Sequence, residues 1–275
     1  MDEWESQLLD LTSLTLTKTD PAAVFWGSDM TSIYNEAFIT IAGRKHPSTM
    51  GSSPALAFAE VWDTFFESRI QLSRTTKQSF SEKALCLMLE RLGFPEETYT
   101  DFVFLPLISR SSEVVGFYHT LIEVTQQILS KRRTSLLLHV SNVLLEVEDL
   151  EAFWNLLIRS LSDAELDTPF ITLYSVSTIS DRKLRLTIPS GDNNMYDACH
   201  LRGSLGYAPG VLPNLVLKTG REVLPEILTE NLQPRGHGKD CNTVVICPLQ
   251  PTNHDSALGF LTVGLSSCRP YDADY

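Results

Sequence analysis

Residues Leu121 to Leu161 read LIEVTQQILSKRRTSLLLHVSNVLLEVEDLEAFWNLLIRSL, and this stretch contains neither glycine nor proline. Its apolar residues recur at helical spacing. One set falls every seven residues: Ile122, Leu129, Leu136 and Val143. A second stripe consists of Leu137, Leu138, Leu144 and Leu145. The apolar face is therefore wider than a two-stranded coiled coil needs, and we expect it to be buried against a partner helix, a domain or both.

This helical pattern is interrupted at Glu148-Asp149-Leu150-Glu151, where Asp149 is a candidate N-cap. The sequence thus predicts two helices, roughly Glu123–Val147 and Leu150–Leu161. The first helix is either part of the core of one large domain or a connecting rod between two domains. The sequence on each side of it favours the second interpretation.

The bulk composition excludes several classes of protein. A chain of 275 residues is long for one domain and natural for two. The formal net charge is −12, and Lys131-Arg132-Arg133 is the one basic run, which we interpret as a solvated helix face. We therefore expect no nucleic-acid partner. No apolar run approaches the ~20 residues that span a bilayer, and the acidic start MDEWESQLLDL lacks the features of a signal peptide.

The cysteines indicate a reducing compartment and no zinc site. The chain has 5 of them, at irregular spacing: Cys86, Cys199, Cys241, Cys247 and Cys268. An odd number without a regular spacing is typical of reduced thiols in a cytosolic protein. Cys241 and Cys247 are too far apart for a CxxC motif, and no pair of histidines completes a zinc set. We expect a cytoplasmic protein.

The first half of the chain predicts a small antiparallel sheet with helices on one face. After a loosely docked N-terminal segment come two strands, short helices and three more strands. The expected strands are Ala22–Trp26, Thr31–Tyr34, Phe80–Leu92, Tyr99–Ile108 and Val114–Leu121. The expected helices are Asn35–Ala42 and an amphipathic helix over Pro54–Ser73.

An ordered string of motifs in this half resembles the sensory PAS-like domain of histidine kinases. The string is Phe25-Trp26-Gly27, Tyr34-Asn35-Glu36-Ala37-Phe38, Gly43-Arg44-Lys45-His46-Pro47, Met50-Gly51, Glu60-Val61-Trp62 and Pro106. The exit from the domain is also similar, from Val115-Gly116-Phe117 through Glu123-Val124-Thr125 to Lys131-Arg132-Arg133. The nearest resemblance is to the input region of large fungal-type hybrid kinases. It implies a sensory domain in a two-component phosphorelay.

The second half resembles a GAF domain in the order of its elements. We expect strands at Thr168–Ser177, Lys183–Ile188, Arg221–Leu224, Thr243–Pro248 and Gly259–Leu265, and a small helix at Asn214–Thr219. Ser190–Pro213 is expected to be a loop that contains one short helix. Arg269 to Tyr275 resembles the motif that opens the final GAF helix. Because the closing helix does not follow, we expect either that this domain is truncated or that its sheet is capped in another way.

Candidate reactive groups in the helix and the second domain lack their usual neighbours. His139 lies on a helix, as a phosphoacceptor histidine does, but Val140-Ser141-Asn142 follow it where a kinase has an acidic residue and then Arg-Thr-Pro. Cys199-His200 resembles the pair that carries the chromophore in bilin-binding GAF domains. The rest of that pattern is missing, and chance proximity of a loop cysteine and a loop histidine is the simpler interpretation.

Aromatic residues of the first domain are candidates for the lining of a small-molecule cavity between sheet and helices. They are Trp26, Tyr34, His46 and Trp62, and Cys199 and His200 complete the candidate ligand-binding residues. The alternative for the aromatic residues is a simple core. No Ser-His-Asp set, metal site or pair of carboxylates can be assembled, so no catalytic residue is predicted. The sequence identifies neither ligand nor cofactor.

These observations predict an α+β protein with two domains whose antiparallel sheets are flanked by helices, PAS-like and then GAF-like, joined by a long amphipathic helix. The expected divisions are an N-terminal segment (1–20), a PAS-like domain (21–122), a connecting helix (123–148) and a GAF-like domain (149–275). The expected role is non-catalytic signal input, in which a ligand or cue in one domain changes the helix within a homodimer.

Other functions remain open at this point. The chain can be the N-terminal fragment of a complete hybrid kinase whose catalytic parts follow downstream. It can be an enzyme that uses the thiol of Cys199, or an inert interaction scaffold. The expected partners are a second copy of the chain, a kinase or other downstream phosphorelay module and an unidentified small molecule.

Overall fold

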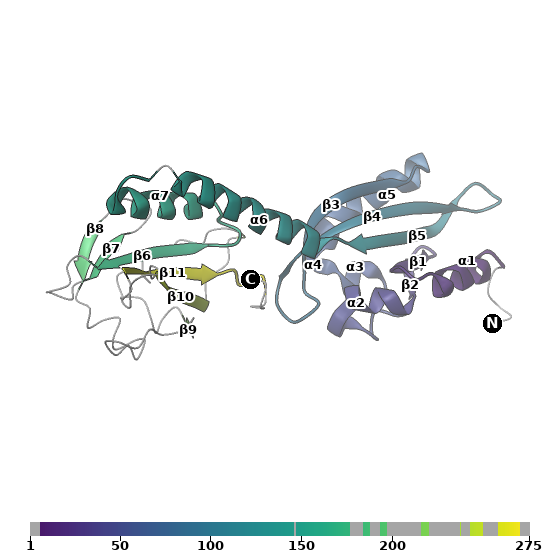
Figure 1. Cartoon of the computed structure of the whole chain (residues 1–275). Coiled ribbons are helices and arrows are strands. Elements are labelled where there is room, and N and C mark those ends of the chain that lie inside the picture. Colours follow the sequence, from purple (N-terminus) through teal and green to yellow (C-terminus); the bar gives the residue numbers. More distant parts are fainter. Residues whose placement is uncertain are drawn as a thin grey trace. The chain divides into compact units, whose positions relative to one another are not determined.

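The computed structural model describes residues 6–145, 147–176, 184–187, 193–196, 216–219, 237, 243–249 and 258–269. The chain divides into a first unit, Met1–Ser130, and a second unit, Lys131–Tyr275. Each unit has its own antiparallel sheet (Figure 1). The predicted α+β class is confirmed for the first unit, whose five-stranded sheet with helices has the arrangement expected of a PAS-like domain.

The first unit opens with helix α1 (Ser6–Thr17) and strands β1 (Ala22–Trp26) and β2 (Thr31–Tyr34), and both strands have the predicted bounds. Gly27 makes the turn between the strands at φ 80°, which favours a residue without a Cβ. Helix α1 is docked more firmly than expected, because its Leu8 and Thr15 are buried and it contacts both strands.

Asn35 fixes the join between β2 and the first helical turn. Its Oδ1 accepts from the backbone N–H of Phe38 and of Ala22, both at 3.1 Å. Its Nδ2 donates to the carbonyl oxygens of Lys18 and Asp20. The residue is 2% exposed, and the two bonds accepted by Oδ1 are buried. The predicted helix Asn35–Ala42 is a 3-10 turn, η1 (Glu36–Phe38), followed by α2 (Ile39–Ala42) and a second 3-10 turn, η2 (Gly43–Lys45).

The prediction of one continuous helix over Pro54–Ser73 is wrong. The segment divides into α3 (Pro54–Ala57), α4 (Ala59–Val61), the π-helical turn η3 (Trp62–Phe66) and α5 (Glu67–Thr76). Phe58 and Val61 leave helical geometry, with φ of −124° and −121°, and both side chains are buried. Burial of these side chains therefore takes precedence over a regular α-helix. Single π-helical turns of this kind are frequent at functional sites.

Three long strands complete the first sheet: β3 (Phe80–Leu89), β4 (Glu96–Ile108) and β5 (Val114–Glu123). The strand order is β2-β1-β5-β4-β3, and all neighbouring pairs are antiparallel. Side chains alternate between the two faces. One face carries the core with the helices, and its buried residues include Phe25, Phe102, Phe104, Phe117 and Leu121. On the other face of β1, Val24 is fully buried and α1 contacts the strand.

The two predicted helices after the first sheet are confirmed as α6 (Thr125–Leu144) and α7 (Leu150–Ser162). Asp149 is the N-cap of α7, and its Oδ1 accepts from the N–H of Ala152 at 2.8 Å. A single residue, Val124, separates the end of β5 from the start of α6. The helix therefore follows directly from a central strand of the sheet.

The expected seven-residue seam does not form a free helix surface. Ile122 lies on β5, Leu129 is 3% exposed, and Leu136 and Val143 are partly buried. The second stripe contains the exposed leucines, since Leu137, Leu138 and Leu145 are 68%, 60% and 82% exposed. Packing within the chain has covered one side of the helix and left the other open.

The second unit has a six-stranded antiparallel sheet in the order β8-β7-β6-β11-β10-β9. Its strands are β6 (Phe170–Val176), β7 (Leu184–Thr187), β8 (Asn193–Tyr196), β9 (Val216–Thr219), β10 (Thr243–Leu249) and β11 (Gly259–Leu265). The small helix expected at Asn214–Thr219 is wrong over 216–219, because these residues pair with β10. The loop expected at Ser190–Pro213 is wrong over 193–196, because these residues pair with β7 as strand β8. The rest of that segment and the strand expected at Arg221–Leu224 lie outside the described residues.

The core of the second unit lies between α7 and the sheet. Trp154, Leu157 and Ile158 of α7 are buried with Ile171 and Leu173 of β6. The apolar residues of α7 recur at i, i+3 and i+4, which places them on one side of the helix. This cluster explains why the predicted amphipathic segment after Asp149 is helical.

The basic run on α6 is partly structural, contrary to the expected solvated face. Arg132 donates from Nε and Nη2 to the two carboxylate oxygens of Asp167, at 2.6 and 2.7 Å. Arg269 donates from Nη1 to the same carboxylate at 2.8 Å. Asp167 and Arg269 are 5% and 8% exposed, so this paired charge is shielded.

Within the described part of the chain, no helix is both long enough and apolar enough to span a bilayer.

Candidate functional site

An apolar cavity of about 60 Å³ lies inside the first unit, between the sheet and the segment that contains α3, α4 and η3. Strands β1, β4 and β5 supply Phe25, Phe102, Phe104 and His119 to its lining. The helical segment supplies Phe58 and Trp62. The broken helix allows these aromatic side chains to face the same space as the inner face of the sheet.

His119 is a buried imidazole in the wall of this cavity. It lies on β5, is 7% exposed, and its ring stacks on that of Phe104 with the centroids 4.0 Å apart. Burial lowers its pKa to about 4, although the hydrogen bond with the Val103 carbonyl acts in the opposite direction. The ring is therefore neutral at physiological pH. Because a carbonyl oxygen can only accept, Nδ1 carries the proton and donates to Val103 O at 3.1 Å.

The predicted ligand-binding residues are divided between the cavity and other places. Of the four predicted residues of the first unit, Trp62 alone lines the cavity. Trp26 ends β1 and is partly exposed. Tyr34 is in the core, and its hydroxyl lies 2.9 Å from Nδ1 of His46. Burial raises the pKa of Tyr34.

The other two predicted residues, Cys199 and His200, lie outside the described residues.

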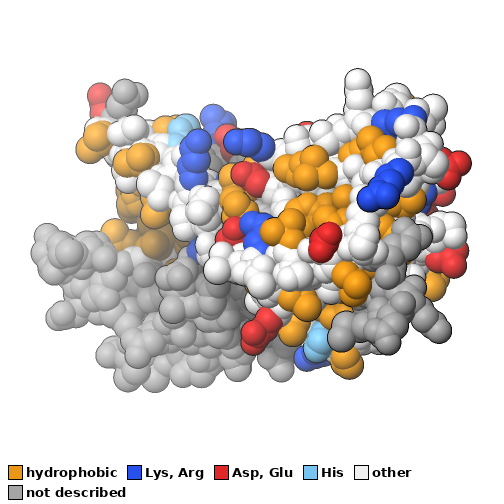
Figure 2. Space-filling view, turned by 90° about the vertical axis from the view of Figure 1, so that its right-hand side faces the viewer, with side chains coloured by type: hydrophobic (Ala, Val, Ile, Leu, Met, Phe, Trp, Pro, Cys, Tyr) orange, Lys and Arg blue, Asp and Glu red, His pale blue; other side chains and the backbone are white. Residues whose placement is uncertain are grey.

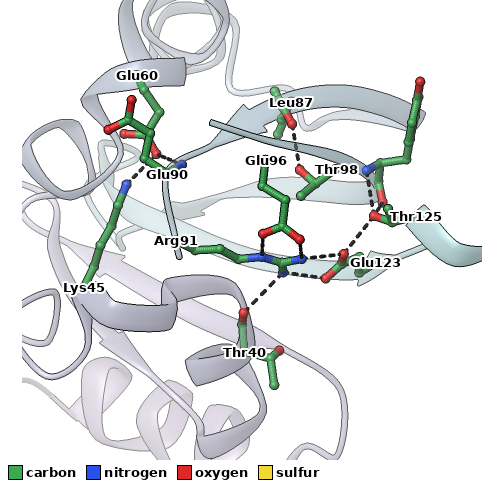
Figure 3. A network of polar contacts seen from close by, with 11 residues as sticks. Thr40, Lys45, Glu60, Leu87, Glu90, Arg91, Glu96, Thr98, Glu123 and Thr125 are labelled. Atoms are coloured by element: carbon green, nitrogen blue, oxygen red, sulfur yellow. Dashed lines mark hydrogen bonds and ion pairs between the residues drawn. The ribbon is translucent and has the colours of Figure 1, made fainter. Parts of the chain in front are cut away.

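A salt bridge secures the helical wall of the cavity. Lys45 pairs with Glu60 of α4, and Glu60 Oε1 also accepts from the backbone N–H of Glu90 at 3.1 Å (Figure 3). The ammonium of Lys45 lies 4.7 Å from the ring centroid of Phe58, which lines the cavity. These contacts connect the end of η2, the α4 segment and the end of β3.

Arg91 is the centre of a polar cluster between the sheet and the start of α6. We define the Arg91 cluster as Arg91, Glu96, Glu123 and Thr125. The guanidinium binds both oxygens of Glu96 at 2.7 and 3.0 Å and both oxygens of Glu123 at 2.7 and 2.8 Å (Figure 3). Such two-pronged pairs are geometrically specific as well as strong. Arg91 thus joins the turn before β4 to the last residue of β5.

The same cluster extends to helices α2 and α6. Arg91 Nη1 donates to the carbonyl of Thr40 in α2 at 3.3 Å. Thr125, the first residue of α6, donates from Oγ1 to Glu123 at 2.8 Å and accepts from the N–H of Tyr99 at 2.9 Å. A Cβ at Gly43 would lie 2.4 Å from the carbonyl oxygen of Arg91, so glycine permits this close approach.

The charges in the cluster stabilise each other. Burial alone would raise the pKa of Glu123, but hydrogen bonds from Arg91 and Thr125 and the charge of Arg91 lower it. Burial alone would lower the pKa of Arg91, but its bonds to Glu96 and Glu123 raise it. The side chains of Arg91 and Glu96 are each 12% exposed and that of Glu123 is 26% exposed. The ion pairs therefore persist across the physiological pH range.

The sequence did not single out His119, which lines the cavity, or Arg91, which is the centre of the polar cluster. His119 belongs to the expected strand Val114–Leu121, and alternation along that strand was the available signal that it faces inward with Phe117 and Leu121. Glu123 and Thr125 were noticed only as part of a family resemblance. In the described part of the chain, no three His, Cys, Asp or Glu side chains lie close enough to hold a metal ion.

No protein-family model matches the chain, and no curated protein matches it in sequence. Among solved structures, a LOV protein from Rhodobacter sphaeroides is similar at 10% identity and a TM-score of 0.38, over 58% of this chain and 99% of that one. A sensory box sensor histidine kinase from Vibrio cholerae is similar at 16% identity and a TM-score of 0.30, over 43% and 93%.

An RNA-binding light-oxygen-voltage receptor is similar at 17% identity and a TM-score of 0.36, over 46% of this chain. This chain covers 36% of the length of that receptor.

Proposed function

We propose that the chain is a signal-input module whose first unit binds a small molecule in its cavity and reports occupancy to helix α6. The observation that carries this proposal is the Arg91 cluster. It joins α2, which supplies the cavity-lining Ile41, to the first residue of α6. The cavity and the helix therefore share a continuous set of contacts through named side chains.

Strand β5 gives the shortest route from the cavity to the helix. His119 and Leu121 line the cavity, and Glu123 follows two residues later on the same face of the strand. A ligand that displaces β5 or α2 changes the position of Glu123 or of the Thr40 carbonyl relative to Arg91. Because the guanidinium binds both groups, the change reaches Thr125 and the start of α6. The ligand must bind one arrangement more tightly than the other to shift their populations.

We also propose that this input serves a two-component phosphorelay in the cytoplasm, with a kinase or another downstream module as partner. What supports the proposal is the motif string from Phe25 to Pro106 and the helix that directly follows β5. A GAF-like role for the second unit and a fungal-type hybrid kinase as parent are finer parts of the same proposal. Hydrophobic side chains and charges of both signs are interspersed on the face in Figure 2, and the net charge is −12, which favours a protein partner over nucleic acid.

Xenon is a suitable first probe, because apolar cavities bind it without any hydrogen bond. Under xenon pressure, we expect amide NMR signals to shift at cavity-lining residues and also at Glu123, Thr125 and Leu129. The second group does not line the cavity, so its shifts report transmission. Shifts that remain confined to the cavity would contradict the proposed input role, and so would the absence of any shift.

We propose further that the chain forms a homodimer through α6. The exposed leucines Leu137 and Leu138, and Leu145 directly after the end of α6, support this, because Leu138 and Leu145 are seven residues apart. This is the second stripe of the helix and not the seven-residue seam expected from sequence. The dimer surface is then distinct from the side of α6 that the chain itself covers.

Sedimentation of the full chain tests the dimer. We expect a dimer at tens of micromolar, and we expect Leu138→Glu with Leu145→Glu to weaken association at least about tenfold, since both changes place charge in an apolar contact. The matched control is Gln126→Glu with Gln127→Glu, at two exposed polar positions of the same helix. A monomeric wild type, or equal effects of the two double variants, would rule out this dimer.

A further inference from the structure

Two polar groups in the cavity have no protein partner. Thr100 and His119 line it and are 3% and 7% exposed. Among the residues that the structure describes, none forms a hydrogen bond with Thr100 Oγ1 or with Nε2 of His119, whose Nδ1 is already bonded to Val103 O. Neither atom is among the fully buried side-chain atoms that lack a partner in the described residues, so a small molecule or water in the cavity can reach them. The two groups are therefore available to hydrogen-bond with a small molecule in the cavity.

The state of the imidazole determines what that partner offers. With the proton on Nδ1, Nε2 has a free lone pair and can only accept. Burial lowers the pKa of His119 to about 4, so the ring keeps this state at physiological pH. A ligand must therefore present an O–H or N–H donor to Nε2. The Thr100 hydroxyl can donate or accept, so it suits a ligand hydroxyl.

The other lining residues limit the charge and size of the ligand. All of them are apolar, and the lining contains no Lys, Arg, Asp or Glu. A bare ion would lose its hydration without gaining a counter-charge, so the cavity selects neutral molecules. The volume of about 60 Å³ is well below the ~150 Å³ of a cavity that accepts benzene. The available space corresponds to a few heavy atoms.

We propose that the cavity binds a short neutral alcohol, whose hydroxyl donates to Nε2 of His119 with the Thr100 hydroxyl as a second hydrogen-bonding group, while its hydrocarbon part contacts the phenylalanine rings. This inference rests on the proposed function, because it names the ligand class of the same cavity. Water alone would satisfy the two polar groups, but it would hydrate the apolar walls. An alcohol satisfies both kinds of surface.

Ethanol and dimethyl ether make a matched pair of probes, since they are isomers and only ethanol has a donor. Formate, with the same number of heavy atoms, tests exclusion of charge. Each is titrated into the full chain while amide signals and the Nε2 nitrogen signal of His119 are recorded by NMR. We expect ethanol to bind about threefold to tenfold more tightly than dimethyl ether, which corresponds to one net hydrogen bond. We expect the Nε2 signal to move with ethanol alone, and formate not to bind.

Variants of the cavity residues show which side chains cause the preference for ethanol over dimethyl ether. His119→Phe keeps an aromatic ring without the acceptor and should reduce the ratio of the two affinities to about one. Thr100→Val keeps the shape of the side chain and should lower the ratio in part. Thr120→Val is the matched control, because it removes a hydroxyl from the opposite face of β5 and should keep the wild-type ratio. If His119→Phe does not fold, the affinity ratio of the wild type and that of Thr100→Val still test the alcohol assignment.

The outcomes separate this inference from the proposed function. Equal affinities for ethanol and dimethyl ether, or a preference that survives His119→Phe, would overturn the alcohol assignment. Binding of neither molecule would also overturn it. In each case the xenon response of α6 is measured on the same sample. If α6 still responds to xenon, the proposed input role is retained although the alcohol assignment is wrong. If α6 does not respond, the proposed input role is wrong too.

Discussion

Replacing Arg91 with Met is expected to lower the free energy of unfolding of the first unit by about 3 kcal/mol. Breaking a buried ion pair from one side leaves the opposite charge without compensation, which costs about 3–5 kcal/mol. Here two carboxylates, Glu96 and Glu123, lose their partner at once, and the partial exposure of Glu123 places the estimate at the lower end. Urea unfolding followed by NMR signals of the first unit measures the change.

The matched control is Lys18→Met, which breaks the exposed pair of Lys18 with Asp20. Exposed pairs contribute little, so its effect should stay within about 0.5 kcal/mol. Adding Glu96→Gln and Glu123→Gln to Arg91→Met should restore part of the loss, because the carboxylates no longer repel each other. An Arg91→Met protein as stable as the control would show that the cluster is not a structural centre.

The stability of the first unit is expected to fall by about 3 kcal/mol between neutral pH and pH 4 because of His119 alone. The folded pKa is about 4, and an unfolded histidine has a pKa of about 6.5. Between these values the unfolded state binds more protons, so acidification favours unfolding. The contribution of the neutral ring is complete above pH 6.5 and is lost as the pH falls toward 4. Urea unfolding across this range measures the loss.

The comparison with His119→Phe isolates this contribution. The variant has no group that titrates at position 119, while the carboxylates that also respond to acid are unchanged. Its stability should therefore fall less steeply than that of the wild type between pH 6.5 and 4. Parallel profiles for the two proteins would mean that His119 is accessible to protons in the folded state.

Sequence periodicity predicted the elements that have a regular pattern. The helical stretch after Leu121 was long and periodic, and Asp149 carried a capping signal that the structure confirms. Strands β1, β2 and β11 were predicted with the observed bounds. In these segments, local preference and tertiary packing favour the same conformation.

The prediction failed where packing decides against local preference. The Pro54–Ser73 pattern is periodic, yet Phe58 and Val61 break the helix so that their side chains are buried. Residues 216–219 were expected in a helix, but pairing with β10 places them in a strand. The spacing of leucines on α6 could not show which stripe the chain itself would cover.

The site was the least predictable part, because its residues meet only through the fold. Of the predicted residues in the first unit, Trp62 lines the cavity, while His119 was read as one position of a strand. Arg91 and Glu123 are 32 residues apart, and their meeting depends on how β3, β4 and β5 pair. No spacing rule in a sequence reports such a contact.

The most direct test of the account is a xenon titration of the wild type beside Thr125→Val, with hydrogen exchange of the first-turn amides of α6 as the readout. Thr125→Val removes the hydroxyl that bonds Glu123 and Tyr99 but leaves the cavity lining unchanged. Thr134→Val, at an exposed site on the same helix, is the control. We predict that xenon changes these exchange rates in the wild type and the control, and not in Thr125→Val. An equal response in all three proteins would contradict transmission through the Arg91 cluster.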